Sequence, residues 1–115
     1  MRISRLMGRK LPVDLSLIKD LSVDVKESEE SVDLMVVGSI MESAKIFEKL
    51  VVRERNGKIL LTVLASLAFW NRAGGPDFHV AHKLAVPPGA YEVLYDDQNG
   101  KTTFLKGVSI SKRTR

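Results

Sequence analysis

Short stretches in which apolar and polar residues alternate recur along the whole chain, and a turn signal closes each one after about 10–15 residues. A period of two places successive side chains on opposite faces of a β-strand. Many short strands separated by turns are typical of a β-sandwich or barrel. The pattern therefore predicts an all-β fold, a single antiparallel β-sandwich of about seven strands. The predicted strands cover residues 15–26, 32–40, 45–54, 58–68, 77–84, 90–95 and 101–110.

The stretch 58–68 is apolar on both of its faces, which predicts a central strand. A helix over 58–69 is the main alternative, because several leucines also match helical spacing. The Asn-Gly pair at 56–57 favours the strand, since this pair supplies the positive φ angles of a type I′ hairpin turn. The β-branched residues Thr62 and Val63 favour it too.

The chain has 115 residues, of which 44% are hydrophobic and 28% charged, so we expect one globular domain with its own core. It has no cysteine, which excludes disulfides, thiolate metal sites and cysteine nucleophiles. No apolar run approaches the ~18 residues that a membrane span needs. The chain as given has no signal peptide, so we expect a cytoplasmic protein unless a leader has been removed.

The formal net charge of +4 is unevenly distributed. Residues 11–110 hold eleven basic and fourteen acidic residues, so only the two ends are basic. We expect a basic, flexible segment at 1–14, the sandwich domain at 15–110 and a basic tail at 111–115. If the ends bind nucleic acid or another anionic surface, binding will be insensitive to sequence and will weaken steeply with salt. The candidate anion-binding residues are Arg2, Arg5, Arg9, Lys10, Lys112, Arg113 and Arg115.

Asp77 and His79 share one face of the strand predicted at 77–84, whereas His82 lies on the opposite face. One metal ion cannot easily take both histidines in this arrangement. We expect His82 near the core, His79 on the surface, and no metal site or cofactor. Asp77 and His79 are candidate partner-binding residues.

Trp70 and Arg72 flank a Gly-Gly-Pro loop and are two further candidates for partner binding. An aromatic residue and an arginine beside a loop have the composition of a binding hot spot. The simpler interpretation is that Trp70 covers the edge of the core and the loop only connects two strands.

The sequence contains no catalytic motif that we recognise: no G-x-S-x-G, no H-E-x-x-H and no phosphate-binding loop. The carboxylate pair Asp96 and Asp97 is explained by the turn preference of aspartate. We therefore expect no enzymatic activity. A small enzyme whose site forms only in a dimer remains an alternative.

The segment Pro87-Pro88-Gly89-Ala90-Tyr91-Glu92-Val93 resembles the approach to the penultimate strand of immunoglobulin-like and fibronectin type III-like domains, and also transthyretin-like modules. The resemblance implies a tyrosine corner, in which the Tyr91 ring lies on the core and its hydroxyl group bonds a nearby backbone group. The resemblance extends over the ten residues 84–93 and implies an immunoglobulin-like architecture, but no activity.

An open sandwich leaves unpaired backbone groups at its sheet edges. We therefore expect an interaction module that binds a protein partner or polymer, or a second copy, through its loops or an edge strand. The alternative function is a nucleic-acid or anionic-surface accessory protein that uses the basic ends. The alternative for the edges is that lysines guard them against such pairing, and the candidates are Lys101 and Lys106 on the last strand and Lys19 and Lys26 around the first.

Overall fold

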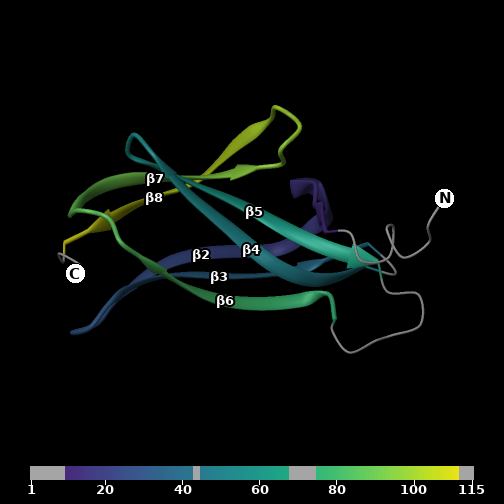
Figure 1. The fold of residues 1–115 in the computed structure, drawn as a ribbon, viewed down its shortest axis with the longest axis horizontal. Helices are drawn as coiled ribbons and strands as arrows, with labels where there is room; N and C mark the ends of the chain where they lie inside the picture. The colour runs from purple at the N-terminus through teal and green to yellow at the C-terminus, as the bar shows by residue number, and fades with distance from the viewer. Residues whose placement is uncertain (1–9, 43–44, 68–74, 112–115) are drawn as a thin grey trace.

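Two β-sheets packed against each other make up the computed structural model, which describes residues 10–42, 45–67 and 75–111 (Figure 1). These ranges contain no α-helix and one short 3₁₀ turn, η1 (Leu15–Leu17). The predicted all-β sandwich is confirmed, and so is the strand rather than the helix over 58–67. The strands are β1 (Leu11–Pro12), β2 (Ile18–Glu27), β3 (Val32–Ile40), β4 (Lys45–Arg55), β5 (Lys58–Leu67), β6 (Asp77–Leu84), β7 (Gly89–Asp96) and β8 (Thr102–Ile110).

The smaller sheet has the order β2–β3–β6, and both of its strand pairs are antiparallel. In the larger sheet β5 pairs with β4 on one side and with β1 and β7 on the other, and β8 pairs with β7. The central position predicted for residues 58–67 is therefore confirmed. One pair departs from the expected antiparallel arrangement, because β5 and β7 run parallel over Lys58–Leu61. The chain leaves β5 to form β6 in the other sheet and then returns in the direction of β5.

Alternate residues of both sheets fill the core, as period-two patterning requires. Along β3, Val32, Leu34 and Val36 are at most 1% exposed, whereas Val37 on the other face is 38% exposed. Along β5, both faces hold buried residues. The buried hydroxyl group of Thr62 donates a hydrogen bond to the Asp96 carbonyl oxygen at 2.7 Å, so this polar side chain is satisfied.

The contact between β3 and β6 depends on a glycine. Gly38 faces Phe78 in the strand register, and a Cβ atom at Gly38 would lie 2.7 Å from the Phe78 ring. That ring also stacks on Phe47 of β4 at a centroid distance of 4.9 Å. Only a residue without a side chain lets the aromatic pair sit this close to β3.

Two predicted turns have the expected geometry. Asn56 and Gly57 have φ angles of +49° and +80°, which confirms the positive φ predicted at both positions. The Tyr91 hydroxyl group donates a hydrogen bond to the Pro87 carbonyl oxygen at 2.6 Å, and its ring packs on the core. The predicted role of Tyr91 in this turn is confirmed.

Residues 11–13 pack with the sandwich, next to the position 15 at which the sequence places the start of the domain. Leu11 and Pro12 pair with β5, and Val13 is 1% exposed. The hydroxyl group of the buried Tyr95 donates to the Val13 carbonyl oxygen and accepts the Val63 N–H at 3.1 Å. Burial raises the pKa of Tyr95 to about 12. A short apolar segment, Leu11–Val13, is thus fixed to β5 by backbone pairing and one buried hydroxyl group.

Candidate interaction site

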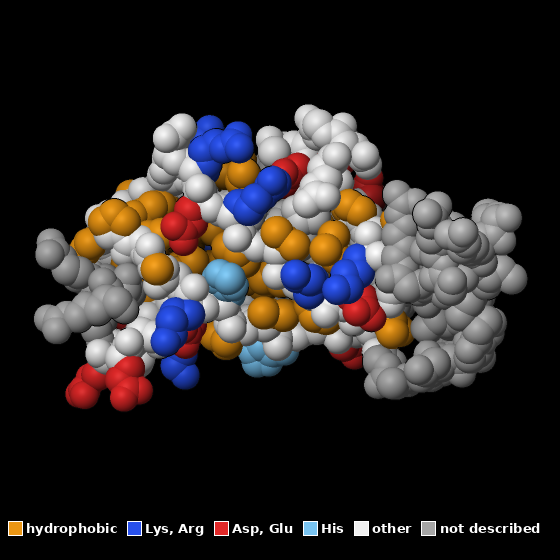
Figure 2. Space-filling model, viewed as in Figure 1, with side chains coloured by type: hydrophobic (Ala, Val, Ile, Leu, Met, Phe, Trp, Pro, Cys, Tyr) orange, Lys and Arg blue, Asp and Glu red, His pale blue; other side chains and the backbone are white. Residues whose placement is uncertain are grey.

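The structure places Asp77 and His79 together on the outer face of the smaller sheet, as predicted. Both are exposed, and they line a shallow depression of about 450 Å³ next to Val37 and Ser39. The Ser39 hydroxyl group donates a hydrogen bond to Asp77 Oδ1 at 2.7 Å, which fixes the carboxylate on this face. His82 is half-buried on the opposite face. Figure 2 shows the histidine side chains in pale blue at separate places on the surface.

The described residues offer little for metal chemistry. Within residues 10–42, 45–67 and 75–111, no group of three or more potential ligands surrounds a common point. Asp77 and His79 form only a pair, and Ser39 already bonds one oxygen of the carboxylate. The carboxylates of Asp96 and Asp97 accept backbone N–H groups of their own turn at 2.8 Å, as the sequence predicted for a turn pair.

Several predicted site residues lie outside the described residues. They are Trp70, Arg72, Arg2, Arg5, Arg9, Lys112, Arg113 and Arg115. Of the candidate anion-binding residues, Lys10 is described, and it is exposed. Of the predicted partner-binding residues that the structure describes, Asp77 and His79 lie together, and both belong to the edge strand β6.

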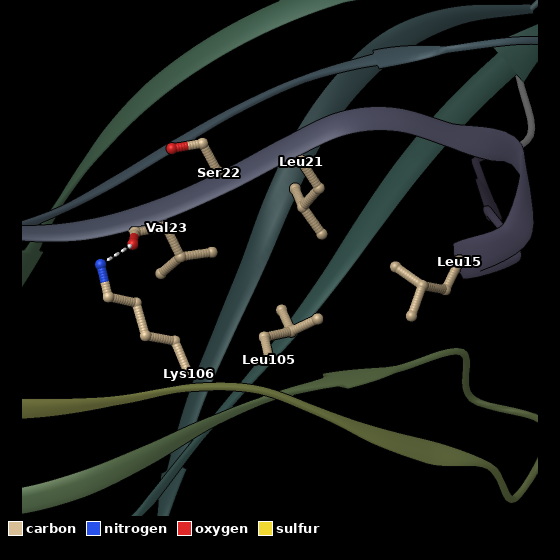
Figure 3. A pocket seen from close by; sticks show the side chains of 6 residues that line it. All are labelled: Leu15, Leu21, Ser22, Val23, Leu105 and Lys106. Carbon is tan, nitrogen blue, oxygen red and sulfur yellow. Dashed lines mark hydrogen bonds between the residues drawn. The ribbon is translucent and has the colours of Figure 1, made fainter.

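The edge strands β2 and β8 face each other along one side of the sandwich. A cleft of about 360 Å³ separates them, and Leu15, Leu21 and Leu105 project into it (Figure 3). Lys106 of β8 crosses this cleft: its Nζ donates to the Val23 carbonyl oxygen at 3.1 Å and pairs with the Asp24 carboxylate. We call this side of the sandwich the β2–β8 seam; it is lined by Leu15, Leu21, Ser22, Val23, Leu105 and Lys106.

Further contacts and irregularities protect the seam. The Ser111 hydroxyl group lies 3.1 Å from both carboxylate oxygens of Glu27 at the end of β2. The register of β2 shifts between Lys19 and Ser22, where Asp20 has a φ of +56°. The β7–β8 register shifts between Val93 and Leu94. Bulges and an edge lysine both hinder the addition of another strand.

The edge strand β4 of the larger sheet is protected by different means. Its register with β5 shifts between Phe47 and Lys49, and its second half carries a run of exposed charged residues, Arg53–Arg55. Arg53 pairs with Asp96. The Phe47 N–H donates to the Gly75 carbonyl oxygen at 2.9 Å, so the first part of β4 already has a neighbour.

The edge strand β6 has none of these protections. All eight of its residues pair with β3 in one continuous register, from Val32↔Leu84 to Ser39↔Asp77. The strand contains no proline, and its charged residues, Asp77 and Lys83, stand near its two ends. Within the described part of the chain, its backbone makes no hydrogen bond to any strand other than β3. In Figure 1 it is the outermost strand of the smaller sheet.

Comparisons of the chain with protein-family models, with curated proteins and with solved structures gave no match. Within the described ranges, no helix has the length and apolarity that crossing a bilayer requires. The described residues thus define the class of protein: a two-sheet β-sandwich in which the edge strand β6 is regular and, within those residues, lacks the protections found at β2, β4 and β8.

Proposed function

We propose that this protein is a non-enzymatic interaction module that binds a protein partner by strand addition along β6. One observation supports this most strongly: β2, β4 and β8 each have a bulge, a bridging lysine or a charged run, whereas β6 is regular over its whole length. Natural sheets protect their edges against unwanted pairing, so a long edge without protection suggests that pairing there is used.

The chemistry of β6 suits strand addition. In an antiparallel pair the hydrogen-bonding groups of alternate residues point to opposite sides, so about half of those on β6 are directed away from β3. An added strand would bond to them, and these main-chain bonds supply affinity whatever the partner sequence. The depression beside Asp77 and His79 offers contacts to a partner side chain, which supply specificity.

A matched pair of lysine substitutions tests the proposal. Ala81→Lys places a charge at an exposed position of β6, and Ser22→Lys does the same on β2, at the other edge of the same sheet. Peptides selected from a random library for binding to the folded protein are titrated into each variant and followed by NMR. We expect wild-type peptides to shift the amide signals of residues 77–84, with binding lost in Ala81→Lys and kept in Ser22→Lys. Peptides that bind elsewhere, or equally to both variants, would refute strand addition at β6.

A further inference from the structure

We infer that the strand added to β6 is β6 of a second copy, paired antiparallel about a two-fold axis at Val80. This inference rests on the proposed function and names its partner. The observation that carries it is the charge pattern of β6. Asp77 lies near one end and Lys83 near the other, with no Asp, Glu, Lys or Arg between them, so two antiparallel copies of the strand can pair their opposite charges.

Symmetry restricts the possible registers. A two-fold axis that makes two edge strands antiparallel stands perpendicular to the sheet, so each residue stays on its own face. Opposed residues must also share a face. The axis therefore passes beside a residue that faces its own copy, and for the middle of β6 that residue is His79, Val80 or Ala81.

The charges select among these three registers. With the axis at Val80, Asp77 lies opposite Lys83 of the second copy, and the pair occurs twice. With the axis at His79, Asp77 faces Ala81 and gains no charged partner. With the axis at Ala81, Lys83 faces His79 and Asp77 faces Ala85, so neither charged residue gains an oppositely charged partner. Only the axis at Val80 places both charged ends opposite groups of the other sign.

The free chain presents both groups for this contact. Asp77 and Lys83 are exposed and lie on the same outer face of β6. Ser39 holds Asp77 through Oδ1, which leaves Oδ2 for a lysine. Lys83 is the register partner of Asp33 on β3, yet it takes part in none of the ion pairs found among the described residues.

The other pairs are compatible with the same register. On the inner face Val80 meets Val80, and Phe78 meets His82. On the outer face His79 meets Ala81, so a large side chain lies opposite a small one. The union of two three-stranded sheets gives a continuous sheet of six strands, a common size.

Charge reversal tests the register directly. Asp77→Lys alone, or Lys83→Asp alone, places like charges opposite each other twice, and we expect each to weaken the homodimer roughly 10-fold or more in sedimentation equilibrium. Mixing the two variants restores opposite charges at both positions, so we expect a heterodimer. Ser39→Ala is the control: it removes the hydrogen bond to Asp77 but keeps the charge, and it should dimerise like the wild type.

Cysteine cross-linking provides a second measurement, because the chain contains no cysteine of its own. With the axis at Val80, residue 79 of one copy faces residue 81 of the other. We expect a mixture of His79→Cys and Ala81→Cys to form disulfide dimers much faster than either alone, since like residues stand ~7–8 Å apart, too far for a disulfide.

Each outcome is decisive. A wild-type chain that stays monomeric while selected peptides bind at β6 would refute the second copy and leave the proposed function standing. A dimer unaffected by either charge reversal, or cross-linked equally well by single variants, would also refute this register. A chain that neither dimerises nor binds peptides at β6 would refute the proposed function itself.

Discussion

The β2–β8 seam and the β6 edge lie at the two edges of the smaller sheet, and they differ in chemistry: polar contacts close the seam, whereas the β6 edge has no such contacts in the described structure. Polar contacts stabilise the seam: Lys106 donates to the Val23 carbonyl oxygen, and Ser111 contacts Glu27. The Tyr95 hydroxyl group also donates to the Val13 carbonyl oxygen, two residues before Leu15 lines the cleft. Beneath the β6 edge the contacts are apolar, and they depend on the close approach of Phe78 to Gly38.

This difference shows how one fold can forbid strand pairing on one side and allow it on the other. At the seam, Lys106 already bonds the Val23 carbonyl group of β2, so a new strand would have to displace this contact. Within the described residues, the outward backbone groups of β6 bond to no other strand, its register with β3 is regular, and its packing around Phe78 is apolar. We therefore expect changes of protonation or charge at the seam to alter the stability of the protein. At the β6 edge we expect changes of side-chain volume to do so.

The largest expected effect concerns Tyr95 at alkaline pH. Its folded-state pKa of about 12 lies above the ordinary value of 10, so the folded chain holds this proton more tightly than the unfolded chain. The stability contributed by Tyr95 is complete below pH 10 and declines as the pH rises toward 12. The loss reaches roughly 2–3 kcal/mol of unfolding free energy. Urea unfolding between pH 8 and 12 measures it.

Two variants separate this effect from the titration of other groups. Tyr95→Phe leaves the buried Val63 N–H without its acceptor, which costs about 1–3 kcal/mol at neutral pH, but it removes the alkaline loss. Tyr91→Phe removes the bond to Pro87 and keeps Tyr95, so its alkaline loss should match the wild type. If Tyr95→Phe and wild type lose stability in parallel above pH 10, Tyr95 is not the group responsible.

Gly38→Ala tests the apolar side and should have the next largest effect. The added methyl group would lie 2.7 Å from the Phe78 ring, so the ring or β3 must move, at a cost of about 1–3 kcal/mol. Gly107→Ala on β8 is the matched control, because a Cβ atom there meets nothing within 4 Å. We expect it to change stability by less than about 0.5 kcal/mol. Equal denaturation midpoints for the two variants would contradict the packing argument.

Local patterning was enough to predict the seven longer strands. It missed the two-residue β1, and it placed a strand over residues 15–17, where the chain forms a 3₁₀ turn before β2 begins at Ile18. The predicted stretches 32–40 and 77–84 match the observed strands to the residue, because clear alternation is bounded by turn residues on both sides. The same alternation correctly placed Asp77 and His79 on one face. These predictions depend only on neighbours in the chain, which a sequence displays directly.

Contacts between distant parts of the chain were not predictable in the same way. The bond from Tyr95 to Val13 joins residues 82 positions apart, and no local pattern marks Val13 as buried. The parallel β5–β7 pair depends on which sheet β6 joins. Of the four lysines suggested to protect sheet edges, Lys106 bonds the backbone of another strand, β2, in the described structure. This contact follows from the strand order, which places β8 beside β2. That β6 is a regular edge is likewise a property of strand order.

Lys106→Met gives the smallest expected change in stability and addresses the seam most directly. Methionine keeps an apolar stem against Leu105 and Leu21 but removes the charge that bonds Val23 and Asp24. Because the pair is about half exposed, we expect a loss of less than about 1 kcal/mol in thermal unfolding.

The freed Val23 carbonyl group, however, exposes β2 to pairing, so light scattering at high concentration should increase. Lys101→Met, at an exposed turn position, removes the same charge without opening an edge and should leave scattering unchanged. Equal scattering by the two variants would mean that Lys106 stabilises the seam without guarding it, and the contrast with β6 would then depend on the bulges and on the Ser111–Glu27 contact.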